Sequence, residues 1–222
     1  MSERRNLGFL LGVLGLTLAG CSFHEPNLHT EQLDIRQVPS SLVVDVGAGD
    51  VWLRGRHVET VFVTAKIDGP TNHVGYELGD DSLTVFDDCN EEPCSVDLSL
   101  DVPENLALTL RTGSGDVSLT SLRGDISLRT GSGDVVGSDL AGLNFSAETG
   151  SGDARLELSP ARRVHVQTGS GDVSLTVPSG AYHLDVSTGS GDQALRGVSN
   201  DASAPDRIDV STGSGDLKIT GI

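Results

Sequence analysis

From residue 40 onward, apolar and polar residues alternate in short stretches that are separated by glycine-rich turns. The pentapeptide Thr-Gly-Ser-Gly-Asp occurs six times, at spacings of 18, 19, 19, 20 and 24 residues, and a weaker copy begins at Val46. A near-constant period of this kind indicates a repeat architecture in which each repeat is one small structural unit. The six full copies begin at Thr112, Thr130, Thr149, Thr168, Thr188 and Thr212.

The residues on both sides of the motif keep one register. The positions two and four before its first residue are apolar in every copy, and those one and three after its aspartate are apolar except at Gly137 and Gln193. This alternation predicts two half-buried strands per repeat, one on each side of a glycine turn. The expected inward residues are Leu42/Val44, Leu108/Leu110, Ile126/Leu128, Phe145/Ala147, Val164/Val166, Leu184/Val186 and Ile208/Val210 before the motif, and Val51/Leu53, Val117/Leu119, Ala154/Leu156, Val173/Leu175 and Leu217/Ile219 after it.

The pattern predicts an all-β, single-domain β-solenoid (β-helix) over residues 40–222, with repeats of about 19 residues. In a solenoid the two walls of each coil bury each other's apolar faces. An antiparallel meander or sandwich is the alternative, but it needs another layer to cover its apolar face, which the repeat region does not supply. No helical period of 3.6 residues follows residue 20, so almost no helix is expected.

The first 39 residues have a different character. Arg4 and Arg5 precede 12 apolar residues, 7–18, which is too short for a membrane-spanning helix and suits a secretory signal over residues 1–20. The segment ends in Leu-Ala-Gly-Cys, which resembles a bacterial lipobox with Cys21 as the lipidated residue; Ser22 after it favours the outer membrane of a Gram-negative bacterium. Residues 21–39 are polar and contain two prolines, so they are expected to form a tether.

Two further cysteines, Cys89 and Cys94, enclose four residues. In an exported protein such a pair is expected to close a disulfide loop. A metal site and a redox pair are the alternatives, but the spacing is not that of a two-residue redox motif and no histidine lies nearby in the sequence.

The chain is acidic, with 32 aspartates and glutamates against 15 lysines and arginines and a net charge of −17. Nucleic acid and bare anionic lipid are therefore poor partners, and no nucleic-acid partner is expected. In consecutive coils the motif aspartates would stack at about 4.8 Å, where amide hydrogen bonds or cations must offset their repulsion. Calcium is the candidate cofactor for this column, and no other is expected. Its candidate ligands are Asp116, Asp134, Asp153, Asp172, Asp192 and Asp216, preceded by Asp50.

Signals of catalysis are weak. The motif serines lack the Gly-x-Ser-x-Gly spacing of a nucleophile elbow, and no lysine follows the glycine turns as in a phosphate loop. The six histidines are scattered, so no triad is predicted and the protein is not expected to be an enzyme. Arg123-Gly124-Asp125 matches an adhesion tripeptide but lies in a second turn of the repeat, where Gly-Asp before a strand is also expected for structural reasons.

The segments TGSGDVSLTSLRGDISLRTGSGDV, LVVDVGAGDVWL and DLSLDVPENLALTL resemble the bacterial putative-adhesin domain family of unknown function, which is related to autotransporter adhesin heads. The resemblance spans about residues 40 to 222 and implies a β-helical fold in a cell-envelope setting. It leads us to expect a non-enzymatic envelope lipoprotein that binds or scaffolds an envelope protein or glycan and meets the membrane through its lipid. A Ca²⁺-stabilised stalk, an envelope-stress component and, less favoured, an envelope enzyme are the alternatives.

Overall fold

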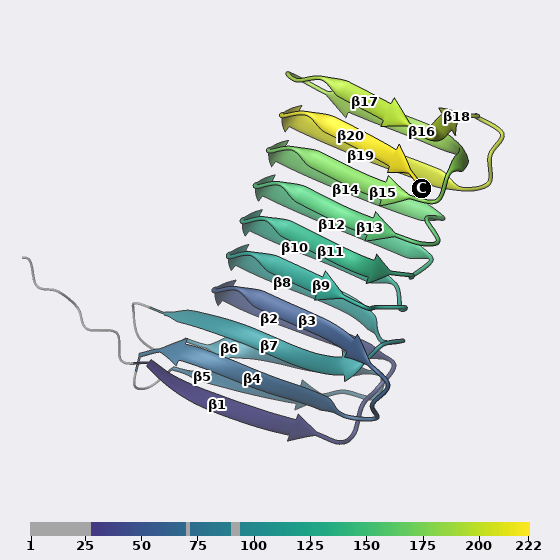
Figure 1. Cartoon of the computed structure of the whole chain (residues 1–222). Helices are drawn as coiled ribbons and strands as arrows, with labels where there is room; N and C mark the ends of the chain where they lie inside the picture. The colour runs from purple at the N-terminus through teal and green to yellow at the C-terminus, as the bar shows by residue number, and fades with distance from the viewer. Residues whose placement is uncertain (1–27, 70–71, 90–93) are drawn as a thin grey trace, which may run out of the picture.

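A computed structural model of the chain describes residues 28–69, 72–89 and 94–222. These residues form 20 β-strands and no helix, which confirms the predicted all-β class. Accordingly, the described part of the chain contains no helix that could cross a membrane. The strands lie in two ten-stranded sheets that stack as the two walls of an elongated solenoid (Figure 1).

Each repeat forms one rung of the solenoid, with a strand in each wall. We call the wall built from strands before the motif sheet 1 and the wall built from strands after it sheet 2. The rungs of sheet 1 are β2 (Ser41–Ala48), β8 (Ala107–Ser114), β10 (Ile126–Ser132), β12 (Asn144–Ser151), β14 (Arg163–Ser170), β16 (Gly180–Thr188) and β19 (Arg207–Ser214). Those of sheet 2 are β3 (Val51–Arg56), β9 (Val117–Thr120), β11 (Val135–Leu140), β13 (Ala154–Leu158), β15 (Val173–Val177), β17 (Gln193–Arg196) and β20 (Leu217–Gly221).

Neighbouring rungs pair in parallel and in register, so equivalent repeat positions form columns along the solenoid. Leu110, Leu128, Ala147 and Val166, for example, occupy one column of sheet 1. The solenoid prediction is therefore confirmed. Antiparallel pairing, the basis of the alternative architecture, occurs among the described strands only at the N-terminal end.

The core lies between the two sheets. Of the expected inward residues, all are buried except Val186, which is partly buried in the last rung. The sequence departure at Gly137 has a packing reason: the register shifts between Gly137 and Leu140, and Leu140 is buried where a side chain at position 137 would have pointed. Gln193, the other departure, is exposed in the terminal rung.

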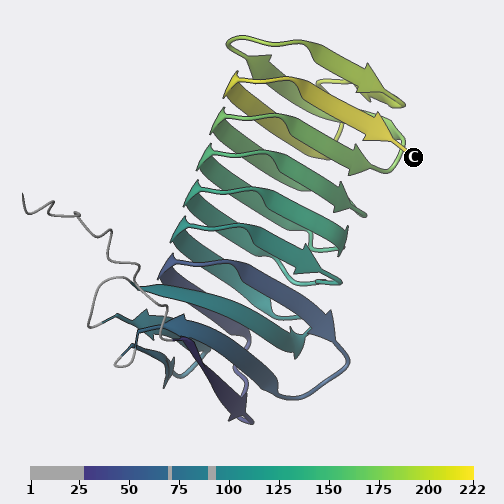
Figure 2. The same ribbon diagram turned by 60° about the vertical axis from the view of Figure 1, so that its left-hand side comes forward.

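The N-terminal end is closed by strands that do not follow the repeat (Figure 2). β6 (Ser82–Asp88) and β7 (Ser95–Pro103) form a rung outside β2 and β3. At the edge of sheet 2, β4 (Val61–Asp68) pairs antiparallel with β7 and β1 (Leu28–Ile35) pairs antiparallel with β4. At the edge of sheet 1, β5 (His73–Leu78) pairs antiparallel with β6. The expectation of an aperiodic tether is thus wrong for residues 28–35, because their alternating side chains form the edge strand of sheet 2.

At the C-terminal end the last two rungs exchange their order. β19 pairs with β14 on one side and with β16 on the other, so the final repeat lies between the fourth and fifth full copies of the motif (Figure 1). Residues 197–206, which include β18 (Val198–Asn200), connect β17 of the outermost rung to β19 of the rung inside it. Successive copies therefore lie in consecutive coils only as far as the fourth full copy.

Candidate functional site

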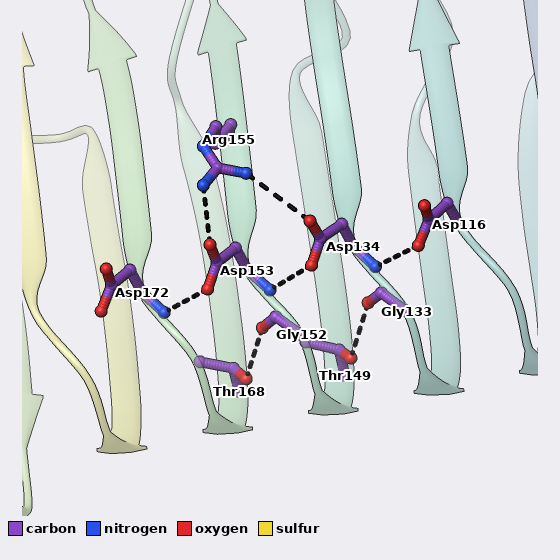
Figure 3. A network of polar contacts seen from close by, with 9 residues as sticks. All are labelled: Asp116, Gly133, Asp134, Thr149, Gly152, Asp153, Arg155, Thr168 and Asp172. Carbon is purple, nitrogen blue, oxygen red and sulfur yellow. Dashed lines mark hydrogen bonds and ion pairs between the residues drawn. The ribbon is translucent and has the colours of Figure 1, made fainter.

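Each Thr-Gly-Ser-Gly-Asp motif forms the corner between the two sheets. At Gly152 φ is +136°, and a Cβ there would overlap the carbonyl oxygen of Gly133 on the neighbouring rung. The buried hydroxyl of Thr168 donates a hydrogen bond to the Gly152 carbonyl at 3.1 Å (Figure 3). Glycine is therefore required at this position twice, once by backbone conformation and once by the close approach of the next rung.

The motif aspartates form a continuous ladder along one edge of the solenoid. The backbone N–H of Asp153 donates to Oδ1 of Asp134, and that of Asp172 donates to Oδ1 of Asp153, both at 2.8 Å (Figure 3). Equivalent bonds of 2.8–3.0 Å connect the remaining members. In spatial order the ladder is Asp97, Asp50, Asp116, Asp134, Asp153, Asp172, Asp216 and Asp192.

The fold thus brings together all six predicted aspartates and Asp50, and adds one residue that sequence reasoning missed. Asp97 lacks the glycine corner, but it is followed by Leu98 and Leu100 at the same offsets as the other copies. Amide donors provide the compensation that the column needs. Arg155 adds a cation to it, 2.7 Å from Oδ2 of Asp153 and 3.7 Å from Oδ2 of Asp134.

Replacing Asp153 with alanine is expected to lower the free energy of unfolding by about 1–2 kcal/mol, because the Asp172 amide loses its acceptor. Asp153→Asn retains an oxygen at the same place and should cost much less. Urea denaturation of both variants measures the difference. Equal destabilisation by the two substitutions would mean that the negative charge, and not the hydrogen bond, is what the ladder needs.

Calcium binding by this column is untested, and the geometry argues against it. Among the described residues, no three aspartates of the column bring ligand oxygens within 4.8 Å of one another, and each Oδ1 except the last already accepts an amide. We therefore expect the melting temperature to be the same in millimolar CaCl₂ and in the calcium chelator EGTA. A melting temperature that is clearly higher in calcium would contradict this expectation.

The outer face of sheet 1 carries two shallow grooves that run across the rungs. One of about 490 Å³ crosses β8, β10, β12, β14 and β19, and small side chains, Thr109, Ser127 and Ser146, line much of it. A second, of about 470 Å³, lies between the column of Arg111, Arg129, Glu148 and Gln167 and the column of motif glycines. Small residues in register therefore leave long channels between ridges of longer side chains.

Charged side chains gather at the C-terminal end of the first groove, and Asp125 adds a carboxylate nearer its other end. At its C-terminal end Arg163, His165, Arg207 and Asp209 come from β14 and β19. Arg207 lies 3.6 Å from Asp209 and 3.4 Å from Asp185, and Arg163 donates to the Asn144 side chain at 3.3 Å. Two guanidinium groups thus gather on one face of a strongly acidic chain.

The Arg-Gly-Asp tripeptide is part of the second corner of a rung. The Arg123 guanidinium donates two hydrogen bonds to the Asp139 carboxylate, at 2.8 and 3.0 Å. The Asp125 carboxylate accepts the backbone and side-chain N–H groups of Asn144. The charged groups of the tripeptide are therefore engaged within the solenoid.

Of the cysteine predictions, the disulfide falls on described residues and the lipidated cysteine does not. Cys89 and Cys94 are joined in a disulfide between β6 and β7. By register this loop takes the place of the glycine corner in that rung, since Asp45 pairs with Phe86 and Val51 with Leu98. Cys21 and the signal residues 1–20 lie outside the described residues.

On the outer face of sheet 2 an ion-pair network lies beside the chain's one tryptophan. Arg54 and Arg56 donate to Oδ1 of Asp101 at 2.9 and 3.0 Å, and Trp52 lines the same hollow of about 260 Å³. Burial raises the pKa of the Asp101 carboxyl, but the hydrogen bonds and charges of Arg54 and Arg56 lower it by more than burial raises it. The pKa therefore lies below its ordinary value of 3.8.

This pKa shift predicts acid sensitivity. Ionised Asp101 stabilises the fold above pH 3.8, and that contribution is lost as the pH falls from 3.8 through the lower pKa of the folded state. The Asp101→Asn variant should therefore be less stable than the unmodified chain at neutral pH and should approach it in stability as the pH falls below 3.8. Denaturation midpoints between pH 2 and 7 test this, and a difference that does not vary with pH would contradict it.

Comparison with known proteins agrees with this architecture. The Toastrack DUF4097 family model matches residues 40–222. The solved structure of a "putative cell adhesion protein" from Clostridium sporogenes is similar to this chain, with 11% sequence identity and a TM-score of 0.52. The match covers 89% of this chain and 100% of that one. The solved structure of a "putative adhesin" from Bacteroides fragilis has 14% sequence identity and a TM-score of 0.43. That match covers 87% of this chain and 97% of the other. No curated protein matches the chain significantly.

The fold and its corners define a parallel β-solenoid with an aspartate ladder. Because the family model spans most of the chain, the protein belongs to the Toastrack DUF4097 family. The likeness to the Clostridium sporogenes protein, at 11% identity, supports the fold and nothing more specific.

Proposed function

We propose that this protein is a non-enzymatic, adhesin-like binding module of the cell envelope that holds an extended glycan along the outer face of sheet 1. The observation that carries the proposal is the groove of about 490 Å³ across β8, β10, β12, β14 and β19. Family membership and the names of the structural neighbours support an envelope setting.

The groove has the chemistry that a glycan needs. Hydroxyl, amide and guanidinium groups from Ser127, Ser146, Asn144 and Arg163 line it, and they offer both donors and acceptors to sugar hydroxyls. Parallel strands repeat these groups at about 4.8 Å along the solenoid, which suits a linear polymer with repeating units. The groove thus presents periodic polar groups on a floor whose exposed surface is mostly apolar.

A protein partner is less well supported. Protein interfaces depend on a few buried aromatic or apolar anchors, and none of the exposed large hydrophobic residues in the described part of the chain lines this groove. Arg207 is already paired with Asp185 and Asp209, but Arg163 bonds the neutral Asn144 side chain. Arg163 therefore suits an anionic substituent on a sugar, because guanidinium groups pair well with carboxylates and sulfates. An acidic polysaccharide is therefore the preferred ligand class.

Filling the groove tests this proposal. We expect the full chain, purified in mild detergent, to bind at least one acidic polysaccharide on an array of bacterial envelope glycans. Ser127→Arg should abolish that binding without changing the melting temperature, and Arg163→Ala should weaken it. Ser174→Arg, an outward position on sheet 2, is the matched control and should bind normally.

Two outcomes would contradict the groove as a glycan site. One is an array on which the unmodified chain binds nothing above background. The other is a bound glycan whose affinity is unchanged in Ser127→Arg, because a large side chain in the groove must exclude a ligand that lies along it. Binding to a protein but not to any glycan would equally contradict the ligand class.

The proposal includes lipid anchoring through Cys21 after removal of residues 1–20, with Ser22 directing the protein to the outer membrane of a Gram-negative bacterium. Mass spectrometry of the mature chain should find an acylated Cys21 at its N-terminus. Cys21→Ser should move the protein from the membrane fraction to the soluble envelope fraction. A mature chain that begins at another residue would refute the anchor.

A further inference from the structure

A cluster of two histidines and one glutamate bridges the two sheets at the N-terminal end of the solenoid. His29 and Glu31 lie two residues apart on β1, the edge strand of sheet 2, and His73 begins β5, the edge strand of sheet 1. Their ligand atoms all lie within 4.8 Å of one another. The fold thus brings together three side chains whose clustering sequence reasoning missed, because His73 is far from β1 in the chain.

The orientation of β1 makes these residue types unusual. His29 and Glu31 belong to the alternating set that continues into Leu33 and Ile35, which is the half-buried to buried face of the strand. Aliphatic side chains at both positions would close the end of the core at lower cost than a carboxylate removed from water. An inward carboxylate with two imidazoles therefore indicates a specific chemical role at this end.

The geometry is close to that of a transition-metal site. Oε1 of Glu31 lies 2.6 Å from Nδ1 of His73 and 3.7 Å from Nε2 of His29. Tetrahedral zinc, with bonds of about 2.0–2.2 Å, separates neighbouring donor atoms by about 3.3 Å. The two observed separations lie on either side of that value, so small side-chain movements would suffice to admit an ion.

We propose that His29, Glu31 and His73 form a binding site for a divalent transition metal, represented by Zn²⁺, that joins the edges of the two sheets. Two imidazole nitrogens and one carboxylate oxygen suit zinc and are poor ligands for calcium or magnesium. The side chains are 32%, 25% and 57% exposed, which leaves a path for the ion and room for water as a fourth ligand.

The carboxylate is also held from its other side. Oε2 of Glu31 accepts the backbone N–H of Val74 at 3.0 Å, so its orientation toward the histidines is fixed by β5 itself. The second three-residue cluster in the described part of the chain, Asp87 with Cys89 and Cys94, offers no comparable site because its sulfurs are joined in a disulfide. The histidine cluster thus has both the ligand set and the support that a metal site requires.

Metal titration of the full chain in mild detergent, followed by elemental analysis, tests the site. We expect one Zn²⁺ per chain, and His29→Ala or His73→Ala should weaken its affinity at least about 100-fold, since even supporting residues contribute 10- to 100-fold. His57→Ala is the matched control and should leave zinc binding unchanged, because His57 lies beside a single carboxylate, that of Glu104.

Two measurements on the unmodified chain keep the test independent of variant folding. Co²⁺ in the site should give the intense visible absorption of a tetrahedral nitrogen and oxygen environment. Zn²⁺ should slow hydrogen exchange in β1 and β5 but not in β12, in the middle of the solenoid. Absence of stoichiometric zinc, or binding that is equally strong in His29→Ala and His73→Ala, would overturn the proposal.

Discussion

Gly152→Ala is expected to lower the free energy of unfolding by about 4 kcal/mol. A positive φ costs a non-glycine residue about 1–3 kcal/mol. Forcing the added methyl group against the Gly133 carbonyl costs about as much again. Because seven rungs repeat this corner, the effect tests the feature on which the whole stack depends.

Gly180→Ala is the matched control for that substitution. A Cβ at residue 180 would meet only Tyr182 Cε2, at 3.8 Å, and Gly180 does not have a positive φ. Its change in stability should stay within about 0.5 kcal/mol. Urea denaturation followed by far-ultraviolet circular dichroism compares the two variants. If both cost the same small amount, the corners are not packed as closely as we describe.

Leu128→Ala should lower the free energy of unfolding by about 2–5 kcal/mol, because it opens a cavity between the two sheets in a central rung. Leu128 is 1% exposed and lies in the column between Leu110 and Ala147. Neighbouring rungs hold the surrounding strands in place on both sides, so the site has little freedom to collapse.

The adjacent residue provides the comparison. Arg129 points outward, its side chain is 67% exposed, and it pairs with Glu148 at 3.0 Å. Exposed ion pairs contribute about 0–1 kcal/mol, so Arg129→Ala should have a small effect. A larger loss of stability for Arg129→Ala than for Leu128→Ala would reverse the assignment of inner and outer faces.

The regular rungs could be predicted from sequence because one short motif marks the end of one strand and the start of the next. Glycine pairs such as Gly150 and Gly152 mark the corner, and alternation on either side assigns each residue to the core or the surface. The aspartate column followed from the same register. Whether backbone amides or cations offset the repulsion of its carboxylates could not be predicted, because sequence does not show where a backbone N–H points.

The two ends of the solenoid could not be predicted in this way. The rung of β6 and β7 has a disulfide loop in place of the glycine corner, so Asp97 escaped notice although Leu98 and Leu100 follow it in the usual register. Residues 28–35 lack strong apolar alternation, because the inward positions include His29 and Glu31. At the other end, motif order along the chain gives no information about which rung lies beside which.

The exchanged order of the last rungs offers the most direct test of in-register stacking. Paired cysteines can bridge Cα atoms at 4.4–6.8 Å, and adjacent strands meet this limit at about 4.8 Å whereas next-nearest strands do not. Gln167 pairs with Ser211, and Ser187 lies one strand further away. The stacked solenoid predicts efficient oxidation of a Gln167→Cys/Ser211→Cys chain and none of Gln167→Cys/Ser187→Cys. The reverse result, a disulfide between positions 167 and 187 but not between 167 and 211, would contradict it.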